Sequence, residues 1–176
     1  IYSLRNTDPG AIKEILDQIV KNGGALADVL VVPVTKSGTT EETVKHKQYF
    51  EKLFKESGLD VKDHIWVITD KGSPVDNGDY EQLEIQLNGK GDIGGRFTSP
   101  TTNVFLLPLA IVAPESVRKI LELAQEMNEV KGSGEDVFLE LGAFLYYWSA
   151  HQGRDKLTMF MPEEFKTIPV WAEQLF

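Results

Sequence analysis

A glycine set among hydroxyl-bearing residues marks the segment of this sequence best equipped for chemistry. The segment extends from Thr35 to Thr43, has the sequence TKSGTTEET and follows the apolar stretch 29–34. A helix that begins inside such a loop presents unpaired backbone N–H groups and a partial positive charge to an anion. Gly38 would let the backbone approach a ligand closely, and the hydroxyl groups add donors. The segment is therefore predicted to bind a phosphate monoester, through Thr35, Lys36, Ser37, Gly38, Thr39, Thr40 and Thr43.

Two other interpretations of this loop have to be weighed. Ser37, Thr39 and Thr40 could serve only as caps of the following helix, because Ser and Thr are preferred at that position. A nucleotide P-loop would place a Gly-Lys pair after the first glycine, whereas Lys36 precedes Gly38 here. The excess of hydroxyls favours an anion site, and the missing P-loop pattern favours a sugar phosphate over a nucleotide.

Alternating strand and helix patterns surround the loop and must position it. Continuous or alternating apolar runs predict strands at 1–4, 29–34, 65–69 and 157–161. Helical spacing of apolar residues predicts helices from Pro9 to Gly23, from the 37–40 loop to Gly58, and over 103–112, 114–131, 137–148 and 168–176. Residues 71–90 are rich in Gly, Asp and Asn, and their structure is left open. The alternation predicts an α/β fold with a doubly wound, mostly parallel sheet flanked by helices.

Composition restricts the possible partners and cofactors. The 176 residues fit one domain over 1–176, and a net charge of -9 argues against nucleic-acid binding, which depends on Lys and Arg. Without cysteine the chain has no disulfide and no thiolate ligand. The three histidines, His46, His64 and His151, lack metal-ligand spacing, so we expect no metal.

The sequence also bears on location and completeness. The most apolar stretch, 104–112, is shorter than the ~18 residues of a membrane span and contains Pro108, so no membrane partner is expected. A cytoplasmic protein is compatible with the cysteine-free composition. Because the chain begins at Ile1 inside an apolar run, we expect it to be a piece of a longer protein.

Four segments, in the same order along the chain, resemble the phosphoglucose isomerase (glucose-6-phosphate isomerase) family, whose domains have the SIS, or sugar isomerase, fold. The segment 36–43 resembles the phosphate loop of that family. Gly94-Gly95-Arg96-Phe97-Thr98, followed by the sequence LLPLA at 106–110, resembles its Gly-Gly-Arg-Phe/Tyr-Ser/Thr signature. Further similarities lie in Asn6-x-Asp8-Pro9 and in the sequence WAEQL at 171–175, while the run 99–105 departs from the family pattern.

The resemblance implies a three-layer SIS-like α/β/α arrangement and a cofactor-independent enzyme of glycolysis and gluconeogenesis, homodimeric as a whole protein. Such an enzyme interconverts glucose 6-phosphate and fructose 6-phosphate. Arg96 would be the catalytic residue present here, stabilising the enediolate without losing its own proton, and Gly94 and Gly95 would contact the substrate. The family's catalytic glutamate, histidine and lysine match no position in this chain, so the chain by itself is expected to be inactive. The alternatives are another SIS-domain sugar-phosphate isomerase and a non-catalytic sugar-phosphate sensor.

Overall fold

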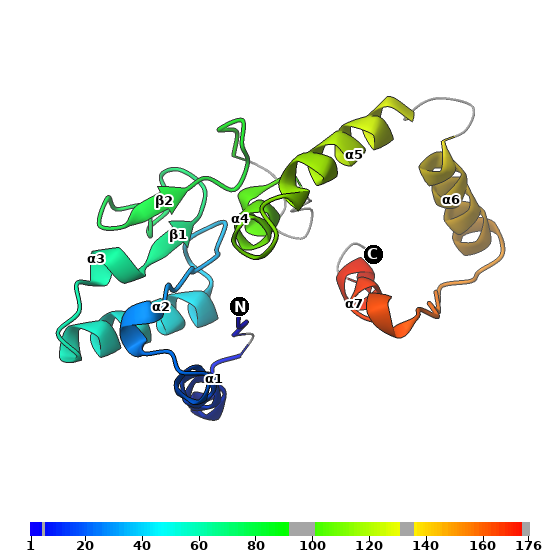
Figure 1. Cartoon of the computed structure of the whole chain (residues 1–176). Coiled ribbons are helices and arrows are strands. Elements are labelled where there is room, and N and C mark those ends of the chain that lie inside the picture. Colours follow the sequence, from blue (N-terminus) through cyan, green and yellow to red (C-terminus); the bar gives the residue numbers. More distant parts are fainter. Residues whose placement is uncertain (5, 92–100, 131–135, 174–176) are drawn as a thin grey trace. The chain divides into compact units, whose positions relative to one another are not determined.

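The computed structural model describes residues 1–4, 6–91, 101–130 and 136–173. The chain forms two compact units, Ile1–Val112 and Ala113–Phe176, coloured along the sequence in Figure 1. The prediction of one domain over 1–176 is not tested by this division and stays a prediction.

Short strands and longer helices alternate through the first unit. Its elements are α1 (Pro9–Lys21), η1 (Leu26–Asp28), α2 (Glu41–Glu56), α3 (Val61–His64), β1 (Trp66–Ile68), β2 (Glu81–Leu83) and α4 (Asn103–Val112). The second unit contains α5 (Ser116–Val130), α6 (Val137–Tyr146), the π-helical turn η3 (Tyr147–His151), the 3-10 turn η4 (Glu163–Phe165) and α7 (Ile168–Glu173). The helices expected from apolar spacing are thus present, with small shifts of their ends.

Aspartate caps fix where several of these helices begin. Asp8 Oδ1 accepts from Gly10 N at 2.8 Å, with Pro9 at the first helical position of α1. Asp60 caps α3 in the same way, and Asp136 accepts from the N–H groups of Phe138 and Leu139 at the start of α6. A carboxylate at this end of a helix satisfies unpaired N–H groups and interacts favourably with the helix dipole. Asp8 is thus the N-cap of α1.

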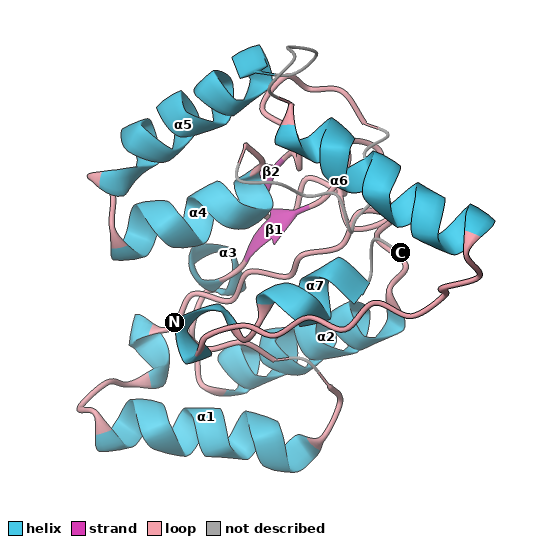
Figure 2. Cartoon of the chain, turned by 90° about the vertical axis from the view of Figure 1, so that its right-hand side faces the viewer, coloured by secondary structure: helices cyan, strands magenta, loops and turns pink. Residues whose placement is uncertain are grey.

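The sheet of the first unit is small and parallel. Strand β1 pairs with β2 in the register Trp66↔Glu81, Val67↔Gln82 and Ile68↔Leu83, and Figure 2 shows the two strands side by side. On the other edge of β1, the segment 31–34 adds two isolated parallel bridges, Val31↔Ile65 and Val34↔Ile68. A helix-rich unit around parallel strands confirms an α/β fold in this coarse sense.

Three of the expected strands differ in the structure. Residues 1–4 and 157–161 have no strand structure, and 29–34 contributes only the two bridges. Among the described residues no backbone pairs with 157–161, so this apolar run lacks the neighbouring strand that a ladder needs, and its Leu157 and Phe160 side chains are 51% and 91% exposed. Conversely, β2 lies in the polar region 71–90 that sequence patterns left open.

The core of the first unit holds α2 against the sheet. Its buried residues come from α1, α2, α3 and the β1 segment, and are Ile12, Phe50, Phe54, Val61, Ile65 and Val67. Phe54 has no exposed surface and its ring stacks on His64 with a centroid distance of 4.8 Å. Burial of these apolar side chains is the main stabilising contribution to α2, whose first turn begins at the hydroxyl-rich loop.

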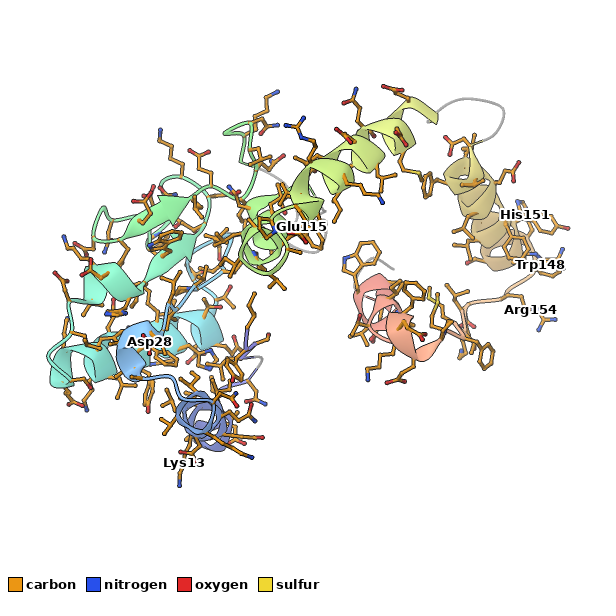
Figure 3. The ribbon with its side chains drawn as sticks, in the orientation of Figure 1. Lys13, Asp28, Glu115, Trp148, His151 and Arg154 are labelled. Carbon is orange, nitrogen blue, oxygen red and sulfur yellow. The ribbon has the colours of Figure 1, made fainter. Side chains whose placement is uncertain are left out.

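The second unit is built from helices with exposed apolar side chains. Trp148 packs edge-to-face against Tyr147 at a centroid distance of 5.8 Å, and its carbonyl accepts from Arg154 N at 2.9 Å. Figure 3 labels Trp148, His151 and Arg154 at the end of this helical stretch. Among the described residues, no helix combines the length and apolar character that a membrane crossing requires.

Candidate anion-binding site

The loop 35–40 connects the extended segment 31–34 to helix α2. Thr35 N donates to Ile68 O at 3.0 Å, which ties the start of the loop to the carboxyl end of β1. Ligands of parallel α/β sheets bind at this edge, where strands end and helices begin. The loop therefore has the position that the sequence predicted for a ligand site.

A buried threonine organises the inside of the loop. Thr35 is only 4% exposed, accepts from Gly38 N at 3.2 Å and donates to Thr40 Oγ1 at 3.1 Å. Since Thr40 Oγ1 accepts this bond, the proton of the Thr40 hydroxyl is left to point elsewhere. Thr43 is used differently, because its Oγ1 donates back to Val34 O at 3.5 Å.

An exposed pair of hydroxyls forms the outside of the loop. Ser37 Oγ and Thr39 Oγ1 are 2.7 Å apart, and Ser37 Oγ also accepts from Thr39 N at 3.2 Å. Each hydroxyl has one proton, and only one of the two is used between them. Whichever residue donates, the pair retains one hydroxyl proton for a ligand.

The amino terminus of α2 adds backbone donors. Its first helical bond runs from Val44 N to Thr40 O at 3.0 Å, and the Thr40 side chain makes no capping bond to the helix. Within the described part of the chain, the N–H groups of residues 41–43 have no acceptor. The structure thus disagrees with a role for Thr40 as the side-chain cap of α2 and leaves these donors open to an anion.

Gly38 is required by packing as well as by its backbone angle. Its φ is +71°, and a Cβ at this position would lie 2.8 Å from Pro74 Cδ and 3.0 Å from Ser73 Cβ. The sequence predicted a close approach between Gly38 and a ligand. The structure shows a close approach between Gly38 and another loop of the protein, 69–74. That loop was not predicted as part of the site, although a Thr-Asp pair directly after a buried strand is a usable signal.

Arg96, Gly94 and Gly95 lie outside the described residues, but both flanks of their segment are described. Gln86 Nε2 donates to Lys90 O at 2.6 Å and to Gly91 O at 3.3 Å, and Gln86 forms an antiparallel bridge with Thr102. A Cβ at Gly91 would lie 3.7 Å from Asp70 Oδ2, in the loop that packs on Gly38. The two flanks thus lie beyond the carboxyl end of β2, the strand next to β1.

The histidines have structural partners. His46 Nε2 is 2.8 Å from Asn6 O, and His64 Nδ1 is 2.9 Å from Val29 O. His151 lies against the rings of Tyr146 and Tyr147, each at a centroid distance of 5.7 Å. Over the described ranges, no group of His, Cys, Asp and Glu side chains gathers in a way that could hold a metal ion.

Comparison with known proteins supports the resemblance inferred from the motifs. No protein-family model matches the chain. Glucose-6-phosphate isomerase from Chlamydia pneumoniae is 41% identical over 100 residues, which are 56% of this chain and 18% of that enzyme. The enzyme from Chlamydia felis is 37% identical over 99 residues, or 56% of this chain and 17% of the relative. The chain thus spans less than a fifth of the length of these curated relatives.

Solved structures agree with these sequence matches. The crystal structure of a glucose-6-phosphate isomerase from Chlamydia trachomatis matches 60% of this chain and 19% of its own, with a TM-score of 0.50 and 33% identity. A hypothetical protein from Thermus thermophilus matches 85% of this chain and 35% of its own, with a TM-score of 0.67 and 27% identity. The chain is therefore similar in sequence and in structure to part of glucose-6-phosphate isomerase.

Proposed function

We propose that the loop 35–40 and the amino terminus of α2 bind the phosphate group of a sugar phosphate, in an enzyme that interconverts glucose 6-phosphate and fructose 6-phosphate. The observation that carries the proposal is the set of outward donors around one glycine, found in a chain similar to glucose-6-phosphate isomerases. Sugar-phosphate isomerase chemistry of the whole protein is part of the proposal, because the matched relatives are much longer than this chain.

The donor set suits a phosphate monoester. Its oxygens accept hydrogen bonds only, and the loop supplies one proton from the Ser37–Thr39 pair, one from Thr40, and the N–H groups of the first turn of α2. Lys36 adds a positive charge to the same loop. In a protein with a net charge of -9, an anion has to be recognised by such a local cluster rather than by the overall field.

Catalysis is proposed for the segment that carries Arg96. Aldose–ketose conversion moves a proton between neighbouring carbons through an enediolate, and a guanidinium stabilises that charge without titrating. Gly94 and Gly95 would let the sugar lie against the main chain. The three-layer SIS-like arrangement, a single domain over 1–176, a cytoplasmic location and a homodimeric whole protein belong to the same proposal.

The binding site is tested by titrating the 176-residue chain with glucose 6-phosphate while its amide signals are followed by NMR. We expect the signals of residues 36–43 to shift with glucose 6-phosphate and with inorganic phosphate, and to remain unchanged with glucose. Thr40→Val should weaken binding about tenfold, the effect of one charge-assisted hydrogen bond. Ser57→Ala, at the opposite end of α2, is the matched control and should bind as the wild type does. Shifts confined to other regions would rule out the loop as the phosphate site.

A further inference from the structure

We propose that Ser73 and Thr69 form a hydroxyl relay that orients the Ser37 amide toward the bound phosphate, so that both are positioning residues of the site. The inference rests on the proposed phosphate-binding function of the loop 35–40. It extends the site to the loop 69–74, which contributes no residue to the predicted phosphate contacts.

Thr69 connects three parts of the unit. It has no exposed surface, its N–H donates to Leu83 O at 3.1 Å, and its carbonyl accepts from Gln82 Nε2 at 3.4 Å. Its hydroxyl donates to Lys36 O at 3.3 Å and lies 2.7 Å from Ser73 Oγ. A buried hydroxyl with two polar neighbours is held in one orientation, because the loss of either bond would leave a polar group unpaired.

The direction of these hydrogen bonds follows from counting protons. Thr69 has one hydroxyl proton, and the Lys36 carbonyl has none, so Thr69 must be the donor in the bond to Lys36. Ser73 must then donate to Thr69. The relay therefore runs from Ser73 through Thr69 to the Lys36 carbonyl, which also accepts from Asp70 N at 3.4 Å. Both donors to this carbonyl come from the loop 69–74.

The hydrogen bonds that fix the orientation of the Lys36 carbonyl also fix the orientation of the Ser37 amide. In a trans peptide the C=O of one residue and the N–H of the next point in opposite directions, and the Lys36–Ser37 bond is trans. Since the Lys36 carbonyl faces loop 69–74, the Ser37 N–H faces away from it. Within the described part of the chain, this N–H donates to no acceptor. It is thus a fixed donor that the phosphate loop can offer to an anion.

The contact at Gly38 keeps the two loops together. The positions of Ser73 and Pro74 leave no room for a Cβ on Gly38, so the loop 69–74 lies directly against the loop whose carbonyl it binds. Ser73 N also donates to Asp70 O at 3.2 Å, which closes the loop into a turn and holds the Ser73 hydroxyl near Thr69. The relay is therefore part of a packed support rather than a chance contact between mobile side chains.

Two relay variants of the 176-residue chain test the inference. Thr69→Val keeps the shape of the side chain and removes its hydroxyl, and Ser73→Ala removes the first donor at a half-buried position, where folding is less at risk. Glucose 6-phosphate binding is measured by NMR titration, with the Ser37 amide shift as a site-specific readout and thermal unfolding as a separate measure of stability. We expect both variants to bind about tenfold more weakly, with a reduced Ser37 shift, and Thr69→Ser to restore binding to within about twofold.

A stability control separates positioning from folding. Val67→Ala lies on β1 and removes buried apolar volume without touching the relay, so it should lower the Tm and leave the Kd and the Ser37 shift unchanged. Relay variants that bind as tightly as the wild type would overturn the relay while the phosphate site stands. A wild-type chain whose loop 36–43 does not respond to glucose 6-phosphate would overturn the proposed function and the relay with it.

Discussion

Small side chains in and beside the loop 35–40 have roles that larger or apolar ones could not fill. The Thr35 hydroxyl is buried and satisfied by two bonds within the loop, whereas the Ser37 and Thr39 hydroxyls are exposed and bonded to each other. One residue type therefore serves two roles that are distinguished only by burial. Gly38 combines a positive φ with a contact that excludes a Cβ.

Gly38→Ala should destabilise the protein more than the same change at a glycine with the same backbone angle. Gly58 has a φ of +73° and nothing within 4 Å of the position that a Cβ would take, so Gly58→Ala isolates the conformational cost, about 1 to 2 kcal/mol. Gly38→Ala adds a clash with Pro74, so we expect a total loss of about 2 to 4 kcal/mol and weaker phosphate binding. Urea unfolding and phosphate titration measure both effects. Equal losses of stability for the two variants would contradict the packing role of Gly38.

Midway along helix α2, a cluster of Lys47, Glu51 and Tyr80 links the helix to the segment before β2. Glu51 Oε1 accepts from Lys47 Nζ at 2.6 Å and from Tyr80 Oη at 2.5 Å, and Lys47 lies 4.5 Å from the centroid of the Tyr80 ring. Burial alone would raise the pKa of Glu51, but the hydrogen bonds from Lys47 and Tyr80 outweigh it and lower that pKa. Burial and the bond to Glu51 raise the pKa of the Tyr80 phenol. The cluster ties the segment leading into β2 to helix α2, which begins at the loop 35–40.

Acid should loosen this cluster. A carboxyl whose folded pKa is lowered contributes stability above its unfolded value, and that contribution is lost as the pH falls through the folded pKa. We therefore expect the difference in unfolding free energy between the wild type and Glu51→Gln to be about 1 to 2 kcal/mol at neutral pH and to shrink as the pH falls below about 4.5. Urea unfolding at a series of pH values measures this difference.

Two further variants sharpen that test. Tyr80→Phe should cost about 1 to 2 kcal/mol at neutral pH, because the phenol with its raised pKa contributes stability as long as it remains protonated. Glu56→Gln removes the partner of Lys52 in an exposed pair of the same helix, where the side chains are 64% and 74% exposed, and should change stability by no more than about 0.5 kcal/mol. A Glu51→Gln effect as small as that of Glu56→Gln, or independent of pH, would contradict the account of the cluster.

At the scale of the whole molecule, the proposal assigns substrate binding to this chain and catalytic turnover to a longer enzyme. The chain carries a set of donors suited to phosphate. The stretch that matches the glucose-6-phosphate isomerases is only 17 to 18% of the length of those enzymes. From the family resemblance we expect none of the 176 positions to supply the residues for proton transfer. The proposed contribution of this chain is therefore substrate binding and charge stabilisation.

The 176-residue chain should bind glucose 6-phosphate without measurable isomerisation. A positioned general base typically contributes about 10² to 10⁴ in rate, and binding alone does not move a proton between carbons. A coupled assay for fructose 6-phosphate checks this, with a full-length chlamydial isomerase as the positive control and mass spectrometry to exclude contaminating enzyme. Robust turnover by the purified chain would show that a base for the reaction lies within these residues.

The sequence by itself determined the features whose hydrogen bonds are local. The apolar spacing of α1, the extent of α2 from Glu41 to Glu56, and the helical character of 103–112 all agree with the structure. Helical bonds join residues four apart, so their pattern is written in a short window. The hydroxyl-rich loop was recognisable for the same reason, since a strand, a glycine and a helix start follow one another in the chain.

Tertiary structure alone decided which strands find partners and what supports the loop. The apolar run 157–161 has no strand structure, while the polar residues of β2 pair with β1, because a strand exists only where another backbone supplies its hydrogen bonds. Thr69 and Lys36 are 33 residues apart in sequence and meet only after the parallel segments align. The contact of Gly38 with Ser73 and Pro74 likewise depends on packing between distant segments, which no local pattern encodes.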